Sequence, residues 1–111
     1  MTTVTVFRCD NGNLAGLRAE GHSNDIVCSA VSVLTQTAVN ALEAVAGVPT
    51  DPLVDEDIGL LQVMLPSKLT PQQANDCQII LRTIQQGLTD IGQSYPAHLR
   101  VVYKEWRETY A

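Results

Sequence analysis

The sequence predicts an α+β fold in the order β-β-α-β-β-α-β, with a largely antiparallel sheet and two long helices packed on it. Residues 25–46 and 71–95 repeat apolar side chains every three or four positions, which is the spacing of an amphipathic helix. Five shorter runs are rich in β-branched, aromatic or leucine residues, as strands are. The chain has 111 residues, 45% of them hydrophobic and 17% charged, which predicts a single domain spanning residues 1–111.

The first two predicted strands form a hairpin. Residues 3–9 make the first strand, and the Asn-Gly pair that follows supplies the positive φ angles of a tight turn. Residues 14–20 return and bring Gly21 and His22 to the far end of the hairpin. Further strands are predicted at residues 53–55, 59–65 and 99–104, and a short tail at residues 106–111.

Both helices carry start and stop signals. Asn24 or Asp25 can cap the first helix, and Gly47 followed by Pro49 ends it. The second helix opens on a Thr-Pro-Gln-Gln motif, in which Thr70 suits the cap and the last glutamine completes a capping box.

Charge and composition restrict the classes of function. The formal net charge of −5 and the scattered basic residues disfavour nucleic acid as a direct partner, because phosphate binding depends on clustered Lys and Arg. An acidic surface instead suits a basic protein partner. Residues 1–7 lack the features of a secretion signal, and no uninterrupted apolar stretch approaches the ~20 residues of a membrane span.

The cysteines and the acidic residues predict neither a disulfide framework nor a metal site. Three widely spaced cysteines are an odd number, which favours a reducing cytoplasm. No Cys-x-x-Cys or His-x-x-x-His pair and no glycine-rich phosphate loop is present, so no metal or cofactor is expected. The acidic run at residues 55–57 is typical of a solvated turn, and Cys9 and Cys77 are predicted to be structural.

Cys28 and His22 are the candidates for chemistry. Cys28 falls in the first turn of the first helix, where free amide hydrogens and the positive end of the helix dipole stabilise a thiolate and could hold an oxyanion. His22, six residues earlier, can reach the thiol, as in the Cys–His pair of thiol peptidases. Ser32 shares a helical face with Cys28, and Asp25 could cap the helix or hydrogen-bond His22.

Each of these residues also has a structural interpretation. A free cysteine near a helix start, such as Cys28, is usually a small buried hydrophobe. A lone loop histidine such as His22 is usually a surface residue. On spacing alone, Asp25 is equally a simple helix cap and Ser32 an ordinary helix residue.

One stretch is more specific than a generic helix start. Gly21-His22 is followed at residues 25–34 by Asp-Ile-Val-Cys-Ser-Ala-Val-Ser-Val-Leu, and at residues 40–43 by Asn-Ala-Leu-Glu. This combination resembles the ribosomal-processing cysteine protease family, Prp. The motif covers a short part of the chain, while the order of strands and helices agrees over nearly all of it.

The resemblance implies a function and assigns roles to residues. It implies that Cys28 is the nucleophile, that His22 is its base, and that Gly21, Asp25 and Ser32 support them. It further implies a cofactor-free homodimer that removes a short N-terminal extension from a bacterial large-subunit ribosomal protein, the twenty-seventh by the standard count. The segment before the cut would be apolar and aromatic, and the mature substrate would be basic.

One departure from the family pattern leaves an alternative open. Only Ser23-Asn24 separates His22 from Asp25, a shorter segment than is typical of the family. It could be a natural short loop, an engineered deletion or an omitted mobile segment. The alternative function is a non-catalytic ribosome-assembly binding module of the same fold, and a third is a redox sensor that uses Cys28.

Overall fold

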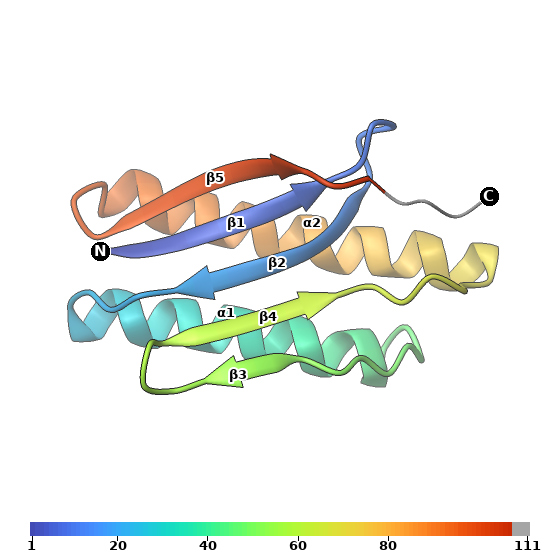
Figure 1. The fold of residues 1–111 in the computed structure, drawn as a ribbon, viewed down its shortest axis with the longest axis horizontal. Helices are drawn as coiled ribbons and strands as arrows, with labels where there is room; N and C mark the ends of the chain where they lie inside the picture. The colour runs from blue at the N-terminus through green and yellow to red at the C-terminus, as the bar shows by residue number, and fades with distance from the viewer. Residues whose placement is uncertain (108–111) are drawn as a thin grey trace.

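The structure is a computed structural model that describes residues 1–107, so the end of the tail predicted at residues 106–111 lies outside it. Five strands and two helices follow one another in the predicted order (Figure 1). Their bounds are β1 Thr2–Arg8, β2 Leu14–Glu20, α1 Asp25–Ala44, β3 Leu53–Asp55, β4 Leu60–Met64, α2 Pro71–Ser94 and β5 Leu99–Glu105. The predicted ends differ from these by at most two residues, which is the ordinary scatter of element ends.

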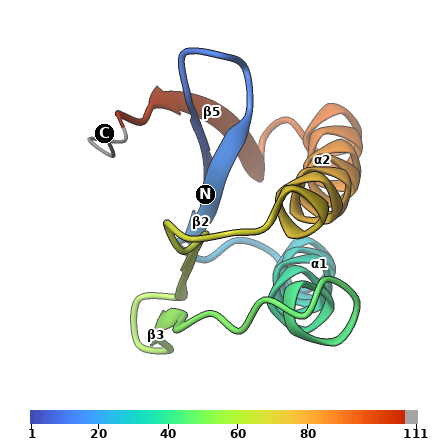
Figure 2. The same cartoon turned by 90° about the vertical axis from the view of Figure 1, so that its right-hand side faces the viewer.

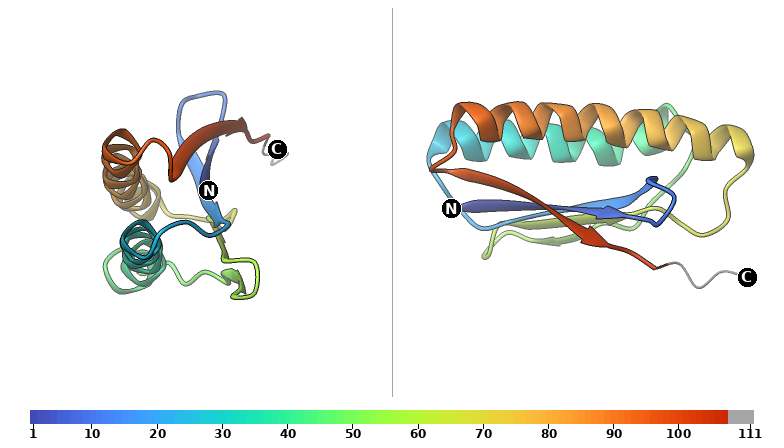
Figure 3. Two further views of the ribbon diagram at one scale, coloured as in Figure 1. Left: turned by 90° about the vertical axis from the view of Figure 1, so that its left-hand side faces the viewer. Right: turned by 90° about the horizontal axis from the view of Figure 1, so that it is seen from above.

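The strands form one mixed sheet in the order β3-β4-β2-β1-β5. Three neighbouring pairs are antiparallel, and β1 and β5 are parallel, so the prediction of a largely antiparallel sheet is confirmed. Both helices cover the same face of the sheet, and the opposite face has no helix on it (Figures 2 and 3). The molecule therefore has two layers, with the core between them.

Both predicted helix starts are formed. The side chain of Asn24 accepts a hydrogen bond from the Val27 amide at 2.8 Å, so Asn24 is the cap of α1, and the alternative cap Asp25 is the first helical residue. At the start of α2, Thr70 and Gln73 exchange both hydrogen bonds of the predicted capping box.

The core consists of aliphatic side chains from the sheet and from the inner faces of both helices. Leu17, Leu42, Leu81 and Leu88 are among its largest fully buried members. By length and mean hydropathy, α1 passes the test for a membrane-spanning helix, as core helices of soluble proteins also do. Its buried apolar residues, Val27, Val31, Ala38 and Leu42, belong to this core.

Three chain segments meet at one end of the sheet. There β2 ends, α1 begins, and the turn at residues 56–59 joins β3 to β4 (Figure 1). The amide of Gly21 donates a hydrogen bond to the carbonyl of Ile58 at 3.1 Å, which ties the β2–α1 connection to that turn. This end of the molecule holds both candidate residues, His22 and Cys28.

Candidate active site

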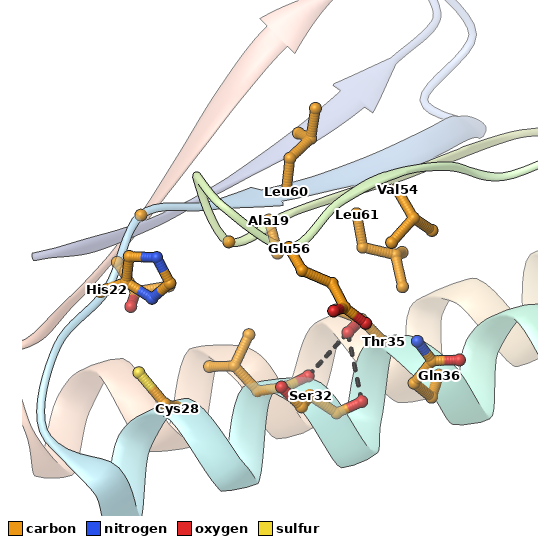
Figure 4. Close-up of a pocket in the computed structure, with 14 residues that line it drawn as sticks. Ala19, His22, Cys28, Ser32, Thr35, Gln36, Val54, Glu56, Leu60 and Leu61 are labelled. Atoms are coloured by element: carbon orange, nitrogen blue, oxygen red, sulfur yellow. Dashed lines mark hydrogen bonds between the residues drawn. The ribbon is translucent and has the colours of Figure 1, made fainter.

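A cavity of about 280 Å³ lies at this end, between α1 and the sheet. His22 and Cys28 both line it (Figure 4). One wall is a stripe of α1 in which Cys28, Ser32 and Gln36 follow one another at intervals of four residues. The opposite wall comes from the β3–β4 hairpin, with Val54, Glu56, Gly59, Leu60 and Leu61. The cavity is therefore a groove that begins at the thiol and continues along the helix.

The thiol of Cys28 is half-buried and is held by the main chain of Ser23. The amide of Ser23 donates to the sulfur at 3.2 Å, and the sulfur donates to the carbonyl of the same residue at 3.6 Å. An amide hydrogen directed at sulfur stabilises a thiolate, because it offers partial positive charge to the anion. The connection to the helix thus provides a hydrogen-bond donor to the Cys28 sulfur.

The first amides of α1 are only partly available to a substrate. The amide of Val27 donates to the Asn24 side chain, and the amide of Cys28 donates to the Asn24 carbonyl at 2.9 Å. The amides of Asp25 and Ile26 precede the first intrahelical hydrogen bond and are the free donors of this turn. An oxyanion held by the helix start would therefore need a donor other than the amides of Val27 and Cys28, which are already engaged.

The ring of His22 lies at the same end of the groove and is exposed to solvent. Its Nε2 lies 3.3 Å from the main-chain carbonyl oxygen of Asp57, in the β3–β4 turn. Within residues 1–107, no hydrogen bond joins the His22 ring to the thiol of Cys28. The fold brings the two side chains into one cavity without a hydrogen bond between them. Catalytic hydrogen bonds are often long or absent in free enzymes and tighten when substrate binds.

A family model described as cysteine protease Prp matches residues 1–100. The chain belongs to the Prp family of cysteine proteases. This confirms the family resemblance and the prediction of a cysteine protease.

Individual relatives agree with this membership. The chain is 29% identical over 109 residues to the ribosomal processing cysteine protease Prp of Bacillus subtilis, covering 91% of this chain and 96% of that protein. The crystal structure of the ribosomal processing protease Prp from S. aureus, in complex with a covalently linked product peptide, is 27% identical and superposes with a TM-score of 0.81. The similarity covers 94% of this chain and 100% of that one. SMU.848 from Streptococcus mutans is also 27% identical, with a TM-score of 0.82 and 96% coverage of both chains.

The residues assigned a supporting role by the Prp resemblance lie in different places. Ser32 lines the groove, and Gly21 forms the turn before His22 with a φ of 91°. A side chain at position 21 would overlap the carbonyl of Met1, so this turn also needs glycine for space. Asp25 is exposed and lies outside the groove, and within residues 1–107 the structure gives it no hydrogen bond to His22.

The other two cysteines are unlike Cys28. Cys77 is fully buried in the core, and burial raises the pKa of its thiol, with a smaller contribution from the neighbouring negative charge of Asp76. Cys9 is half-buried at the end of β1 and does not line the groove. Within the described part of the chain, no three His, Cys, Asp or Glu side chains gather as a metal-binding group.

Sequence reasoning missed the part of the site that comes from the β3–β4 turn. The acidic run at residues 55–57 is exposed, as predicted for a solvated turn, yet the carbonyl of Asp57 contacts His22. A main-chain carbonyl leaves no trace in residue type, because every residue has one. The signal that could have indicated a special turn is Gly59, which directly precedes β4 and has a φ of 61°.

Proposed function

We propose that this Prp family member is a cysteine endopeptidase that removes the short N-terminal extension of a bacterial large-subunit ribosomal protein, the twenty-seventh by the standard count. The observation that carries the proposal is the opening of the Cys28 thiol and the His22 ring into one groove. The names of the B. subtilis and S. aureus relatives, both ribosomal processing proteases, support the class of substrate.

The proposed reaction begins when His22 takes the proton of the Cys28 thiol. The thiolate attacks the scissile carbonyl carbon, and the amides at the start of α1 stabilise the resulting oxyanion. His22 then gives its proton to the leaving amine, and the C–N bond breaks to leave a thioester on Cys28. Water, deprotonated by His22, hydrolyses the thioester and restores the thiol.

The groove suits an extended peptide with apolar side chains. Val54 and Leu61 point from the hairpin wall toward α1, while Ser32 and Gln36 of α1 offer polar groups to a peptide backbone (Figure 4). The peptide would run along the α1 stripe, so that the scissile bond lies over Cys28. The net charge of −5 favours the encounter with a basic ribosomal protein.

The proposal also covers the oligomeric state, the cellular compartment and the cofactor requirement of the enzyme. The enzyme would work as a homodimer in the cytoplasm, without a cofactor, and would bind neither nucleic acid nor a membrane directly. Residues 1–111 would form a single cysteine-protease domain.

The test is cleavage of a synthetic peptide that spans the extension, followed by mass spectrometry of the products. Replacing Cys28 with Ala should abolish cleavage, since Cys28 supplies the one thiol among the described residues that line the groove. Cys9→Ala is the matched control, because it removes a half-buried thiol outside the groove and should cleave like the wild type. Cleavage by Cys28→Ala at the wild-type rate would refute the proposal.

The second candidate, a non-catalytic binding module of ribosome assembly, is favoured by one observation. The His22 ring contacts Asp57 and the thiol contacts Ser23, and within residues 1–107 no hydrogen bond joins His22 to Cys28. A protein that binds the extension peptide, leaves it uncut and does not react with iodoacetamide at neutral pH would establish this function instead.

A further inference from the structure

The β3–β4 turn is built to meet the segment that carries His22. Within the turn, the Asp57 amide donates to the side chain of Asp55 at 3.0 Å, and the Gly59 amide donates to the Glu56 carbonyl at 3.2 Å. These two hydrogen bonds hold the turn in shape. The hydrogen bond from Gly21 to Ile58 at 3.1 Å then fastens it to the residue just before His22.

Gly59 leaves the space that the His22 ring occupies. A Cβ atom added at Gly59 would lie 2.9 Å from Cε1 and 3.2 Å from Nδ1 of that ring, and 2.6 Å from the Gly21 carbonyl oxygen. Carbon atoms do not approach this closely, so any side chain at position 59 would push the ring or its backbone aside. The φ of 61° at Gly59 adds a second reason for glycine, because residues with a Cβ rarely adopt it.

The Asp57 carbonyl selects the protonation pattern of the ring. A carbonyl oxygen can only accept a hydrogen bond, so the contact at 3.3 Å requires the hydrogen to be on Nε2 of His22. In the neutral ring, Nδ1 is then the nitrogen that can accept a proton. The carboxylate of Asp25, which the resemblance suggested as a partner of this ring, makes no such contact within residues 1–107.

We infer that the β3–β4 turn is the positioning element of the catalytic histidine: the Asp57 carbonyl orients the His22 ring with Nδ1 as its basic nitrogen, and Gly59 provides the space that this orientation needs. The inference rests on the proposed function for its catalytic consequence. In the reaction, Nδ1 takes the proton of the Cys28 thiol, while Nε2–H keeps donating its hydrogen bond to the Asp57 carbonyl oxygen, which stabilises the imidazolium. Asp57 and Gly59 are thus positioning residues that act through His22.

The first test is independent of catalysis and uses the wild-type protein. Long-range ¹⁵N–¹H NMR of the histidine rings, at a pH alkaline enough for both to be neutral, reports which nitrogen carries the hydrogen. His22 should show the Nε2–H form, and His98, the second histidine of the chain, is the internal reference. A His22 ring with its hydrogen on Nδ1 overturns the inference, whatever the protein cleaves.

The second test compares Gly59→Ala with Gly47→Ala. Gly47 has nearly the same φ, 68°, but lies past the opposite end of α1, and a Cβ added there meets nothing within 4 Å. The control therefore reproduces the backbone strain without the contact to His22. In Gly59→Ala, the His22 ring signals should lose the Nε2–H pattern while those of His98 stay unchanged. Gly47→Ala should leave both histidines as they are.

Kinetics on the extension peptide complete the comparison. Gly59→Ala should lower kcat by about tenfold to a hundredfold with little change in KM, as expected when a catalytic group is misplaced by ~1 Å. Gly47→Ala should keep the wild-type kcat. Equal kcat values and equal His22 spectra for Gly59→Ala and wild type would refute the inference. Absence of cleavage by the wild type, with the expected NMR pattern, would refute the proposed function alone.

Discussion

Cys28 and Cys77 have the same side chain and opposite surroundings. Cys28 opens into the groove and receives an amide hydrogen from Ser23, whereas Cys77 is fully buried among aliphatic side chains. Burial without a compensating donor favours the neutral thiol, which is why the pKa of Cys77 is raised. The two thiols therefore differ in access and in hydrogen-bond partners, and Cys28 is the one that opens into the groove.

The buried thiol predicts a pH dependence of stability. The raised pKa keeps the Cys77 thiol protonated in the folded chain at a pH where the unfolded chain already ionises it. The free energy of unfolding should therefore be unaffected by this group below about pH 9 and should fall as the pH rises above it. Urea denaturation across this range, compared between wild type and Cys77→Ala, measures the effect.

Comparing the free energies of unfolding of wild type and Cys77→Ala separates the effect of Cys77 from that of tyrosine and lysine residues, which titrate in the same range. Above about pH 9, the free energy of unfolding should fall more steeply with pH for the wild type than for Cys77→Ala. In the native protein at neutral pH, iodoacetamide should also leave Cys77 unmodified, as peptide mass mapping will report. Equal slopes in both proteins, or ready alkylation of native Cys77, would contradict this prediction.

At the level of single residues, the sequence identified the right neighbourhood and left two residues open as the helix cap. The Gly-His and Asp-Ile-Val-Cys motif located His22 and Cys28, which the structure places in one groove. The sequence offered Asn24 or Asp25 as the cap, with Asp25 alternatively a partner of His22, and the structure gives the cap to Asn24. Two adjacent polar residues at a helix start satisfy the same pattern, and only the backbone geometry distinguishes them.

At the level of elements, the groove depends on how closely β2 and β4 approach. Gly16 of β2 pairs with Met64 of β4, and a Cβ added at Gly16 would overlap the Val63 carbonyl and lie 2.5 Å from the Met64 sulfur. The pairing of these strands positions the hairpin wall that faces α1. Glycine is thus required at position 16 by a close approach of backbones.

Two glycine substitutions should have opposite effects on stability. Gly16→Ala should lower the free energy of unfolding by about 1–3 kcal/mol, because overpacking forces β2 and β4 apart. Gly92→Ala should raise it by about 0.5–1 kcal/mol, because alanine is the better helix former inside α2. At Gly92 the nearest atom to an added Cβ is the Leu99 oxygen at 3.6 Å, an ordinary contact. Chemical denaturation of the two variants and the wild type measures both changes in the free energy of unfolding. A Gly16→Ala variant more stable than wild type would contradict the prediction, because it would show that β2 and β4 can separate at no cost.

At the level of the whole molecule, one layer of helices leaves the other face of the sheet without cover. The edge strand β3 is also open, with Leu53 and Val54 exposed over half or more of their surfaces, at 53% and 50%. Proteins rarely leave sheet edges and apolar side chains exposed without a partner. These features agree with the proposed homodimer and with a peptide that enters the groove beside Val54.

We expect light scattering to give twice the mass of a single chain, and denaturation to give one cooperative transition whose midpoint rises with protein concentration. A dimer buries surface that the monomer exposes, so mass action links association to stability. A mass of one chain at all concentrations would refute the dimer, and two separate transitions would refute the single domain. Gly47 lies outside the groove, so the free energy of unfolding of Gly47→Ala serves as the reference for a substitution that does not touch the groove.

Most of the fold could be predicted from the sequence, because helix periodicity, the capping box at Thr70 and the hairpin turn are local patterns. The parallel pairing of β1 with β5 could not be predicted in this way. It joins Val4 to Val101, and strands so far apart pair according to how the helices pack on the sheet. Local propensity contains no information about such partners.

The sequence by itself determined the element order, the two helices and the motif that identifies His22 and Cys28. Only the tertiary structure decided what surrounds them: the Ser23 amide on the thiol, the Asp57 carbonyl on the imidazole and the hairpin wall of the groove. The physical reason is that main-chain donors and acceptors are the same in every residue, so their use depends on folded geometry. His22 and Asp57 are 35 positions apart, and folding of the sheet brings them together.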